Sequence, residues 1–169
     1  MQVPMLFREV QRMRSAWVWG LVLISPTVLL YAVLRQIVWD HPFGDHPAPD
    51  GLLIVMAVVF GLGLPVLFWI LRLETEVRAD GLYVRYFPFH PSFRRIPIEG
   101  LRRWEVRTYS PIREYGGWGI RQGRRGRAYN ASGNRGVELE FNSGERILIG
   151  SQHPDQLAAA LDSLRSPQA

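Results

Sequence analysis

The feature of this sequence best suited to chemistry is a short run of arginines. The run holds four arginines and two glycines within seven residues and no acidic residue: Arg121, Arg124, Arg125 and Arg127. Guanidinium groups at this density favour anions, because each carries a permanent charge and several N–H donors. Three interpretations remain open: a site for anionic lipid headgroups, a nucleic-acid contact assisted by Trp118 and Tyr129, and a solvated hairpin tip without a ligand.

A second group of chemically capable residues lies between two apolar stretches. His41 and His46 share a short segment with three aspartates, Asp40, Asp45 and Asp50. Imidazole and carboxylate groups at this spacing are candidate ligands for a divalent metal. The alternative is a polar, proline-rich loop that keeps two helices apart. On that interpretation, which we favour, the segment holds no metal.

Composition excludes several kinds of catalysis. The sequence has no Cys, and all 20 basic residues are Arg. These absences rule out disulfides, thiolate nucleophiles, Cys-ligated zinc, lysine Schiff bases and a P-loop lysine. Glu74 and Glu76 lie two residues apart, but we expect them to face solvent beside arginines of neighbouring strands. His90 and His153 are predicted to be solvated or to cap an element. The sequence therefore predicts a binding protein without a cofactor rather than an enzyme.

Two long uncharged stretches constrain where these residues lie. Residues 15–34 and 51–71 contain no Asp, Glu, Lys or Arg over 20 and 21 positions. A helix of that length spans about 30 Å, the thickness of the hydrocarbon core of a bilayer. The sequence therefore predicts a transmembrane helical hairpin over residues 15–71, with helices at about 15–38 and 51–71 and an outer loop at 39–50.

Small and polar residues inside the two predicted helices indicate how they pack. Ser25-Pro26-Thr27 lies in the middle of the first helix, where proline kinks a helix and hydroxyls can satisfy the freed backbone groups. Ala57 and Gly61 form a small-xxx-small pair in the second helix, a spacing that lets helices approach closely. Ala57 and Gly61 are therefore the candidate helix–helix contact.

The placement of arginines predicts the orientation of the hairpin. Residues 1–14, interpreted as an N-terminal tail, carry Arg8, Arg12 and Arg14 against the single acid Glu9, whereas the loop between the helices is acidic. Arginine-rich flanks of membrane helices remain on the cytoplasmic side. Both termini are therefore predicted to be cytoplasmic in a multi-pass membrane protein.

From residue 72 onward the apolar pattern changes to the period of two that is typical of strands. Asp80-Gly81 is a strong hairpin signal. After Pro154, leucines recur at helical spacing on one face. The sequence therefore predicts an α+β chain in which residues 72–165 form a small antiparallel β-barrel or sandwich. It would have about seven strands, capped by a C-terminal α-helix, with a tail at 166–169.

Two segments carry a resemblance to a known family. The stretch from Leu73-Glu74-Thr75-Glu76-Val77 through Asp80-Gly81-Leu82 is similar to the opening hairpin of bacterial pleckstrin-homology-like (PH-like) domains. Residues 136–151, followed by Pro154-Asp155-Gln156-Leu157, resemble their last hairpin and helix. The resemblance covers roughly residues 71–165, and two membrane helices ahead of such a domain match the layout of uncharacterised bacterial membrane proteins. It implies an interaction module or scaffold rather than an enzyme.

The predicted function is that of a membrane-anchored interaction or regulatory module at the inner face of a bacterial cytoplasmic membrane. The domain follows the second helix without a linker, so its arginine run is predicted to meet anionic lipid at the inner leaflet. The sequence also predicts a protein partner, without identifying it, and disfavours nucleic acid. Two alternatives remain open. One is an accessory subunit of a membrane complex that acts through Ala57 and Gly61, and the other is a metal-sensing or enzymatic role for the His41 and His46 loop.

Overall fold

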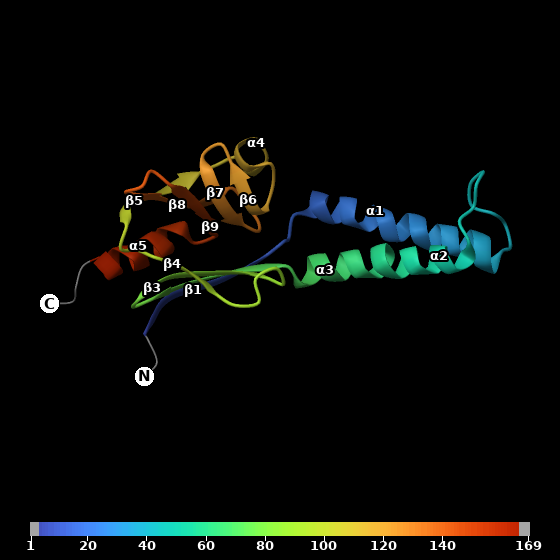
Figure 1. The fold of residues 1–169 in the computed structure, drawn as a ribbon, viewed down its shortest axis with the longest axis horizontal. Helices are drawn as coiled ribbons and strands as arrows, with labels where there is room; N and C mark the ends of the chain where they lie inside the picture. Colours follow the sequence, from blue (N-terminus) through green and yellow to red (C-terminus); the bar gives the residue numbers. More distant parts are fainter. Residues whose placement is uncertain (1–3, 166–169) are drawn as a thin grey trace. The chain divides into compact units, whose positions relative to one another are not determined.

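The computed structural model describes residues 4–165 (Figure 1). They form an α+β chain of two compact units. The helical unit comprises residues 14–70, and the sheet unit takes in the chain up to Met13 and from Leu71 onward. The predicted tail at 166–169 lies outside the described residues, as do residues 1–3 of the predicted N-terminal tail.

The helical unit is a pair of long apolar helices. The first runs through α1 (Ala16–Val33) and the π-helical η1 (Leu34–Val38), and the second through α2 (Asp50–Met56), η2 (Ala57–Gly63) and α3 (Leu64–Ile70). Both are long and apolar enough to cross a membrane, at 23 and 21 residues. Their ends lie within one residue of the predicted helices at about 15–38 and 51–71.

Hydroxyl groups near the two helix prolines bond to backbone carbonyls. Thr27 Oγ1 donates to the carbonyl of Leu23 at 2.7 Å, and Ser25 Oγ donates to the carbonyl of Phe60 on the other helix at 2.8 Å. Phe60 lies five residues before Pro65, which has no N–H to offer that carbonyl in a π-helical turn. Ser25 therefore supplies the missing donor and ties the two helices together.

The first strand corrects the prediction of an N-terminal tail. The sequence predicts a tail over residues 1–14, but Met5–Arg12 form strand β1, which pairs antiparallel with β2 (Arg72–Arg78). The pairing extends from Met5 opposite Arg78 to Arg12 opposite Arg72. The helical unit is therefore an insertion between two neighbouring strands. Local sequence signals miss this pairing because the whole helical hairpin separates the two strands.

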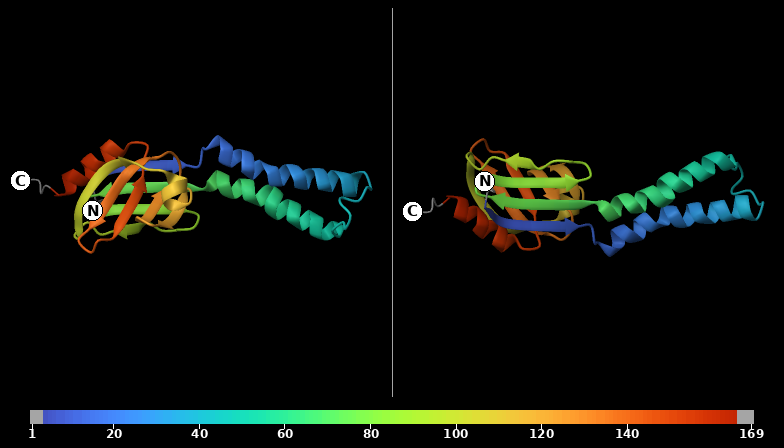
Figure 2. Two further views of the ribbon diagram at one scale, coloured as in Figure 1. Left: turned by 90° about the horizontal axis from the view of Figure 1, so that it is seen from above. Right: turned by 90° about the horizontal axis from the view of Figure 1, so that it is seen from below.

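The sheet unit contains two sheets that pack face to face and do not close into a barrel (Figure 2). The first has the order β1-β2-β3-β4, with β3 at Gly81–Phe87 and β4 at Arg94–Ile96. The second has the order β5-β8-β9-β7-β6. From β5 to β9, its strands span Leu101–Thr108, Gly119–Gly123, Gly126–Asn130, Arg135–Phe141 and Arg146–Gly150. Neighbouring strands are antiparallel except β7 and β9, which are parallel.

The described residues contain nine strands where the sequence predicts about seven. Residues 118–130, whose sequence pattern indicates one hairpinned or bulged strand, form two strands, β6 and β7, joined by a tight turn. The other additional strand is β1. The predicted C-terminal helix is confirmed as α5 (Pro154–Arg165).

The core lies between the two sheets and beneath α5. Period-two alternation turns Leu73 and Val77 of β2 and Ile149 of β9 inward, and all three are fully buried. Leu157 and Leu161, one helical turn apart on α5, are buried against them. A smaller apolar cluster lies on the other face of the second sheet, near the short helix α4 (Pro111–Tyr115): Tyr109, Tyr115, Ala128 and Leu148.

Strand β1 is also held by polar groups that point into the domain. The buried carboxylate of Glu9 accepts hydrogen bonds from Ser151 Oγ at 2.5 Å and from the Gln152 N–H at 2.7 Å. Gln11 Nε2 donates to the carbonyl of Gly150 at 2.6 Å. These bonds join the edge of the first sheet to the end of β9 and to the turn that leads into α5.

Candidate anion-binding site

Strands β6 and β7 hold the arginine run as a tight hairpin. Gly123 and Gly126 form the last cross-strand pair, so Arg124 and Arg125 make the two-residue turn. Gly126 has a φ of +116°, and a Cβ at this position would collide with the backbone of Arg146 on β9. The glycine therefore permits both the turn and its close approach to the neighbouring strand.

The structure does not bring the four arginines to one surface. Across the hairpin, Arg121 lies opposite Ala128 and Arg127 lies opposite Gln122, which places the two arginines on opposite faces. Arg121 Nε donates to the carbonyl of Trp118 at 2.9 Å. This bond turns the Arg121 side chain back along its own strand and away from the tip.

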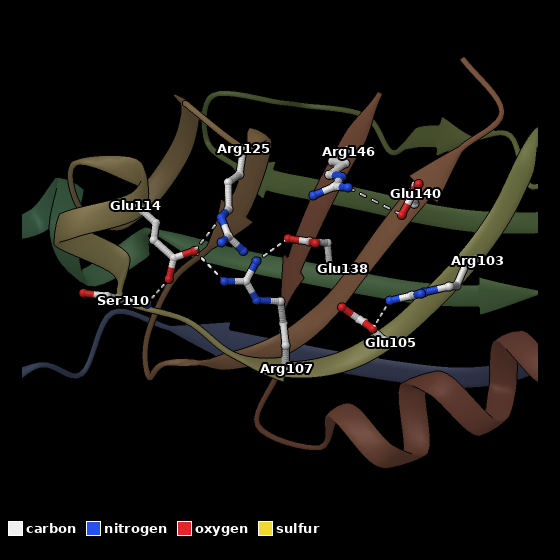
Figure 3. Close-up of polar contacts among 9 residues, drawn as sticks. All are labelled: Arg103, Glu105, Arg107, Ser110, Glu114, Arg125, Glu138, Glu140 and Arg146. Carbon is white, nitrogen blue, oxygen red and sulfur yellow. Dashed lines mark hydrogen bonds and ion pairs between the residues drawn. The ribbon is translucent and has the colours of Figure 1, made fainter. Parts of the chain in front are cut away.

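Arg125 belongs to an ion-pair network on the outer face of the second sheet (Figure 3). Its Nε lies 3.9 Å from Oε2 of Glu114 in α4, and the same oxygen accepts a bond from Arg107 Nη2 at 2.5 Å. Arg107 also pairs with Glu138 on β8. Burial raises the pKa of Glu114, but the Ser110 N–H and the Arg107 guanidinium outweigh it and hold the pKa below its ordinary value. Glu114 therefore stays ionised and compensates part of the charge of Arg125.

Arg124 and Arg127 lack this compensation. Both are exposed, and among residues 4–165 neither has a carboxylate within 4.0 Å. Residues 115–137 contain no Asp or Glu, so the hairpin supplies no acid of its own. Arg124 and Arg127 are therefore the members of the run whose charge is available to an external anion.

The predicted helix–helix contact lies within the helical unit. A Cβ on Gly61 would be 3.8 Å from Pro26 Cα and 3.9 Å from Leu29 Cβ on α1. Ala57 and Gly61 also line an apolar groove of about 300 Å³ formed by residues of both helices. These small residues therefore let the two helices of one chain approach each other.

The loop between the helices does not assemble a metal site around His41 and His46. In the described part of the chain, no three His, Asp or Glu side chains gather in a group that could hold a metal ion. His41 Nδ1 bonds to the carbonyl of Trp39 at 2.5 Å. Gln36 Nε2 donates to the Asp50 carboxylate at 2.7 Å, so one aspartate helps to close the loop. This geometry favours the interpretation as a connecting loop.

Two carboxylates that we expected to face solvent are buried. Glu74 and Glu76 do lie beside arginines of neighbouring strands, as the sequence predicts, but they are only 2% and 5% exposed. The arginine side chains lie over the carboxylates and exclude water from them. Alternation along the strand places both glutamates on the outer face, but it does not show that neighbouring side chains cover them.

His90 is likewise buried rather than solvated. Its Nδ1 has no hydrogen-bond partner among residues 4–165, and its ring centroid lies 6.3 Å from that of Tyr129. Burial lowers the pKa of His90 below its ordinary value, and the charge of Arg94 lowers it further. The folded protein therefore favours the neutral imidazole.

The stability of the sheet unit is expected to fall as the pH drops below about 6.5, the ordinary pKa of histidine. Below that pH the unfolded chain binds a proton that folded His90 resists, whereas above it both states are neutral at this position. His90→Gln should flatten the decline towards acid pH, and His46→Gln, an exposed position in the loop of the helical unit, should not. Urea unfolding midpoints over a pH series would measure this. Equal pH slopes for the wild type and His90→Gln would contradict the prediction.

Of three comparisons with known proteins, only the one with protein-family models gives a match. A search of the curated proteins finds no match, and a search of the solved structures finds none. A family model does match, over residues 1–166, and therefore takes in both units of the chain.

Proposed function

The chain belongs to a protein family of unknown function (DUF6141), and from the geometry of its arginine run we propose that it is a membrane-anchored interaction module whose β6–β7 hairpin binds anionic lipid headgroups. The helical unit would span a bacterial inner membrane twice, with both termini and the sheet unit on the cytoplasmic side. The ligand-binding residues would be Arg124 and Arg127. The role proposed is binding, without catalysis or a cofactor.

The uncompensated charge of Arg124 and Arg127 is the observation that carries this proposal. Arg124 lies in the turn and Arg127 on the strand just after it, and neither has a carboxylate within 4.0 Å among residues 4–165. Guanidinium groups bind phosphate through paired N–H donors. Each arginine held near an anionic membrane surface contributes roughly 1 kcal/mol of attraction.

The architecture of the chain supports a position at a membrane. Two helices are long and apolar enough to cross one, and a single residue separates the end of α3 from the start of β2. Two packed sheets with a C-terminal helix over their core are the arrangement expected of a PH-like domain. On this proposal, the arginine excess on the two flanks of the hairpin sets the orientation.

Vesicle binding by the full chain tests the proposal. The protein would be reconstituted in nanodiscs of neutral phosphatidylcholine and mixed with vesicles of phosphatidylcholine alone or with added phosphatidylglycerol. We expect binding to the anionic vesicles only, weakened by salt. Arg124→Ser with Arg127→Ser should weaken it by about 30-fold, which corresponds to two arginines at roughly 1 kcal/mol each.

A matched control separates the hairpin from general charge. Arg102→Ser with Arg103→Ser removes the same charge from exposed positions on β5 and should leave vesicle binding nearly unchanged. The proposal fails if both double variants lose binding equally, because the attraction would then be diffuse. It also fails if the wild type binds neutral and anionic vesicles alike.

A further inference from the structure

The outer face of the first sheet carries a layer of arginines. Because side chains alternate along a strand, the register of β1, β2 and β3 places five of them on one side. We call this surface the arginine face, and it consists of Arg8, Arg12, Arg72, Arg78 and Arg85. In the view from below in Figure 2, no helix of the sheet unit crosses this sheet.

Two buried carboxylates hold the arginine face in place. Glu74 pairs with Arg72 at 2.6 Å and with Arg85 at 2.7 Å. Glu76 pairs with Arg78 at 2.7 Å and, more loosely, with Arg8 at 3.4 Å. The two carboxylate side chains are 3% and 7% exposed, whereas that of Arg8 is 53% exposed. Solvent therefore meets guanidinium groups, while the acids lie beneath them.

Aromatic rings fix the same guanidinium groups from the side. Arg72 lies over the ring of Phe87 at 4.9 Å, and Arg85 lies over that of Phe93 at 4.6 Å. Arg78 lies 4.3 Å from the centre of the Tyr83 ring. Side chains held in this way lose little conformational freedom when they bind a partner, which favours association.

The opposite surface of the domain has a different charge pattern. On the outer face of the second sheet, arginines alternate with carboxylates that reach solvent, such as Glu105 beside Arg103 and Glu140 beside Arg146 (Figure 3). The charge of these arginines is therefore largely compensated by neighbouring glutamates. The arginine face instead carries five arginines over two buried acids, so its excess positive charge is complementary to an acidic partner.

The spacing of the two ion-pair clusters indicates the shape of that partner. One cluster is centred on Glu74 and the other on Glu76, two residues apart on one strand, or roughly 6.6 Å. Alternate side chains of any extended segment have the same spacing. We propose that the arginine face docks an extended acidic segment of a protein partner, with carboxylates at alternate positions. This surface is distinct from the lipid-binding hairpin and does not depend on that proposal.

Peptide binding by the full chain in neutral nanodiscs tests the docking surface. The probe is a synthetic peptide of alternating Glu and Thr. One control peptide replaces Glu with Gln, and another has the same composition with its Glu residues contiguous. We expect the alternating peptide to bind at low salt, more tightly than either control. Arg8→Gln with Arg12→Gln should weaken this binding by about tenfold.

These two arginines were chosen because their loss should spare the fold. Arg12 has no carboxylate within 4.0 Å among residues 4–165, and Arg8 forms the longest of the four ion pairs on this face. Thermal unfolding would verify that the double variant remains folded. Arg102→Gln with Arg103→Gln is the matched control for charge, and Arg124→Ser with Arg127→Ser separates this surface from the hairpin.

Four outcomes would overturn the docking proposal. The first is no binding of the alternating peptide at low salt, and the second is equal affinity for the alternating and contiguous peptides. The third is a loss of peptide binding that follows the hairpin variant rather than the Arg8 and Arg12 variant. The fourth is an arginine face that binds anionic vesicles but no peptide, which would make it a second lipid contact.

Discussion

A protein consisting of residues 71–169 is not expected to fold its sheet unit cooperatively. It keeps the whole region predicted from its sequence pattern to be the domain, but it lacks β1. That strand pairs with β2 along its length, and its Glu9 and Gln11 hold the end of β9. Its loss would expose the edge of β2 and leave buried donors unpaired. Small domains are stable by only about 5–15 kcal/mol, so we expect this loss to unfold the unit.

Removing the helical unit while keeping β1 should yield a folded, soluble domain. Arg12 and Arg72 are opposite each other at the ends of β1 and β2. Replacing residues 14–70 with Asn-Gly would therefore join the two strands through a two-residue hairpin turn. We expect a single cooperative thermal transition for the joined chain and none for residues 71–169. Circular dichroism melts and gel filtration of the two proteins would decide. Matching transitions in both proteins would show that β1 is dispensable.

Substitution of Glu9 should produce a large loss of stability for a single polar side chain. Glu9→Ala removes the acceptor for the buried Ser151 Oγ and for the part-buried Gln152 N–H. We expect the free energy of unfolding to fall by about 2–4 kcal/mol. Denaturant unfolding of the full chain in detergent would measure the change.

Two further variants test the cause of that loss. Glu9→Gln keeps the shape and one acceptor oxygen, so it should recover about half of the lost stability. Glu145→Ala removes an exposed carboxylate on the turn before β9 and should change stability by less than about 0.5 kcal/mol. If Glu9→Ala were as mild as Glu145→Ala, the hydrogen bonds of Glu9 would contribute little to the fold.

The two long helices and most strands could be predicted because their signals are local. An uncharged stretch, a two-residue alternation or an Asp-Gly turn is visible within a few residues. Strand β1 has no such signal, since its inward positions include the polar Glu9 and Gln11 rather than an apolar series. Their partners lie at residues 150–152, at the far end of the sequence. A pattern that depends on so distant a partner is not visible in one chain segment.

Prediction of the candidate site from the sequence is also limited to local features. Glycines around the arginine run predict a hairpin, and the structure has one at β6 and β7. The sequence does not show that Arg121 and Arg127 occupy opposite faces, because that depends on the register of the two strands. Nor does it show that Glu114 approaches Arg125, because residues 110–117 resemble a loop rather than the helix α4. Register and tertiary contacts therefore reduce four candidate arginines to two.

The insertion of the helices between β1 and β2 has a consequence for biosynthesis. The ribosome makes β1 first, yet its partner strand emerges only after both helices have been synthesised. At about 5–20 residues per second, nearly sixty intervening residues take roughly 3–12 s. During that interval β1 has no strand to pair with, and its exposed Met5, Leu6 and Val10 need protection from other chains. The sheet unit can close only after the helical hairpin has been made, so translation itself sets the order of assembly.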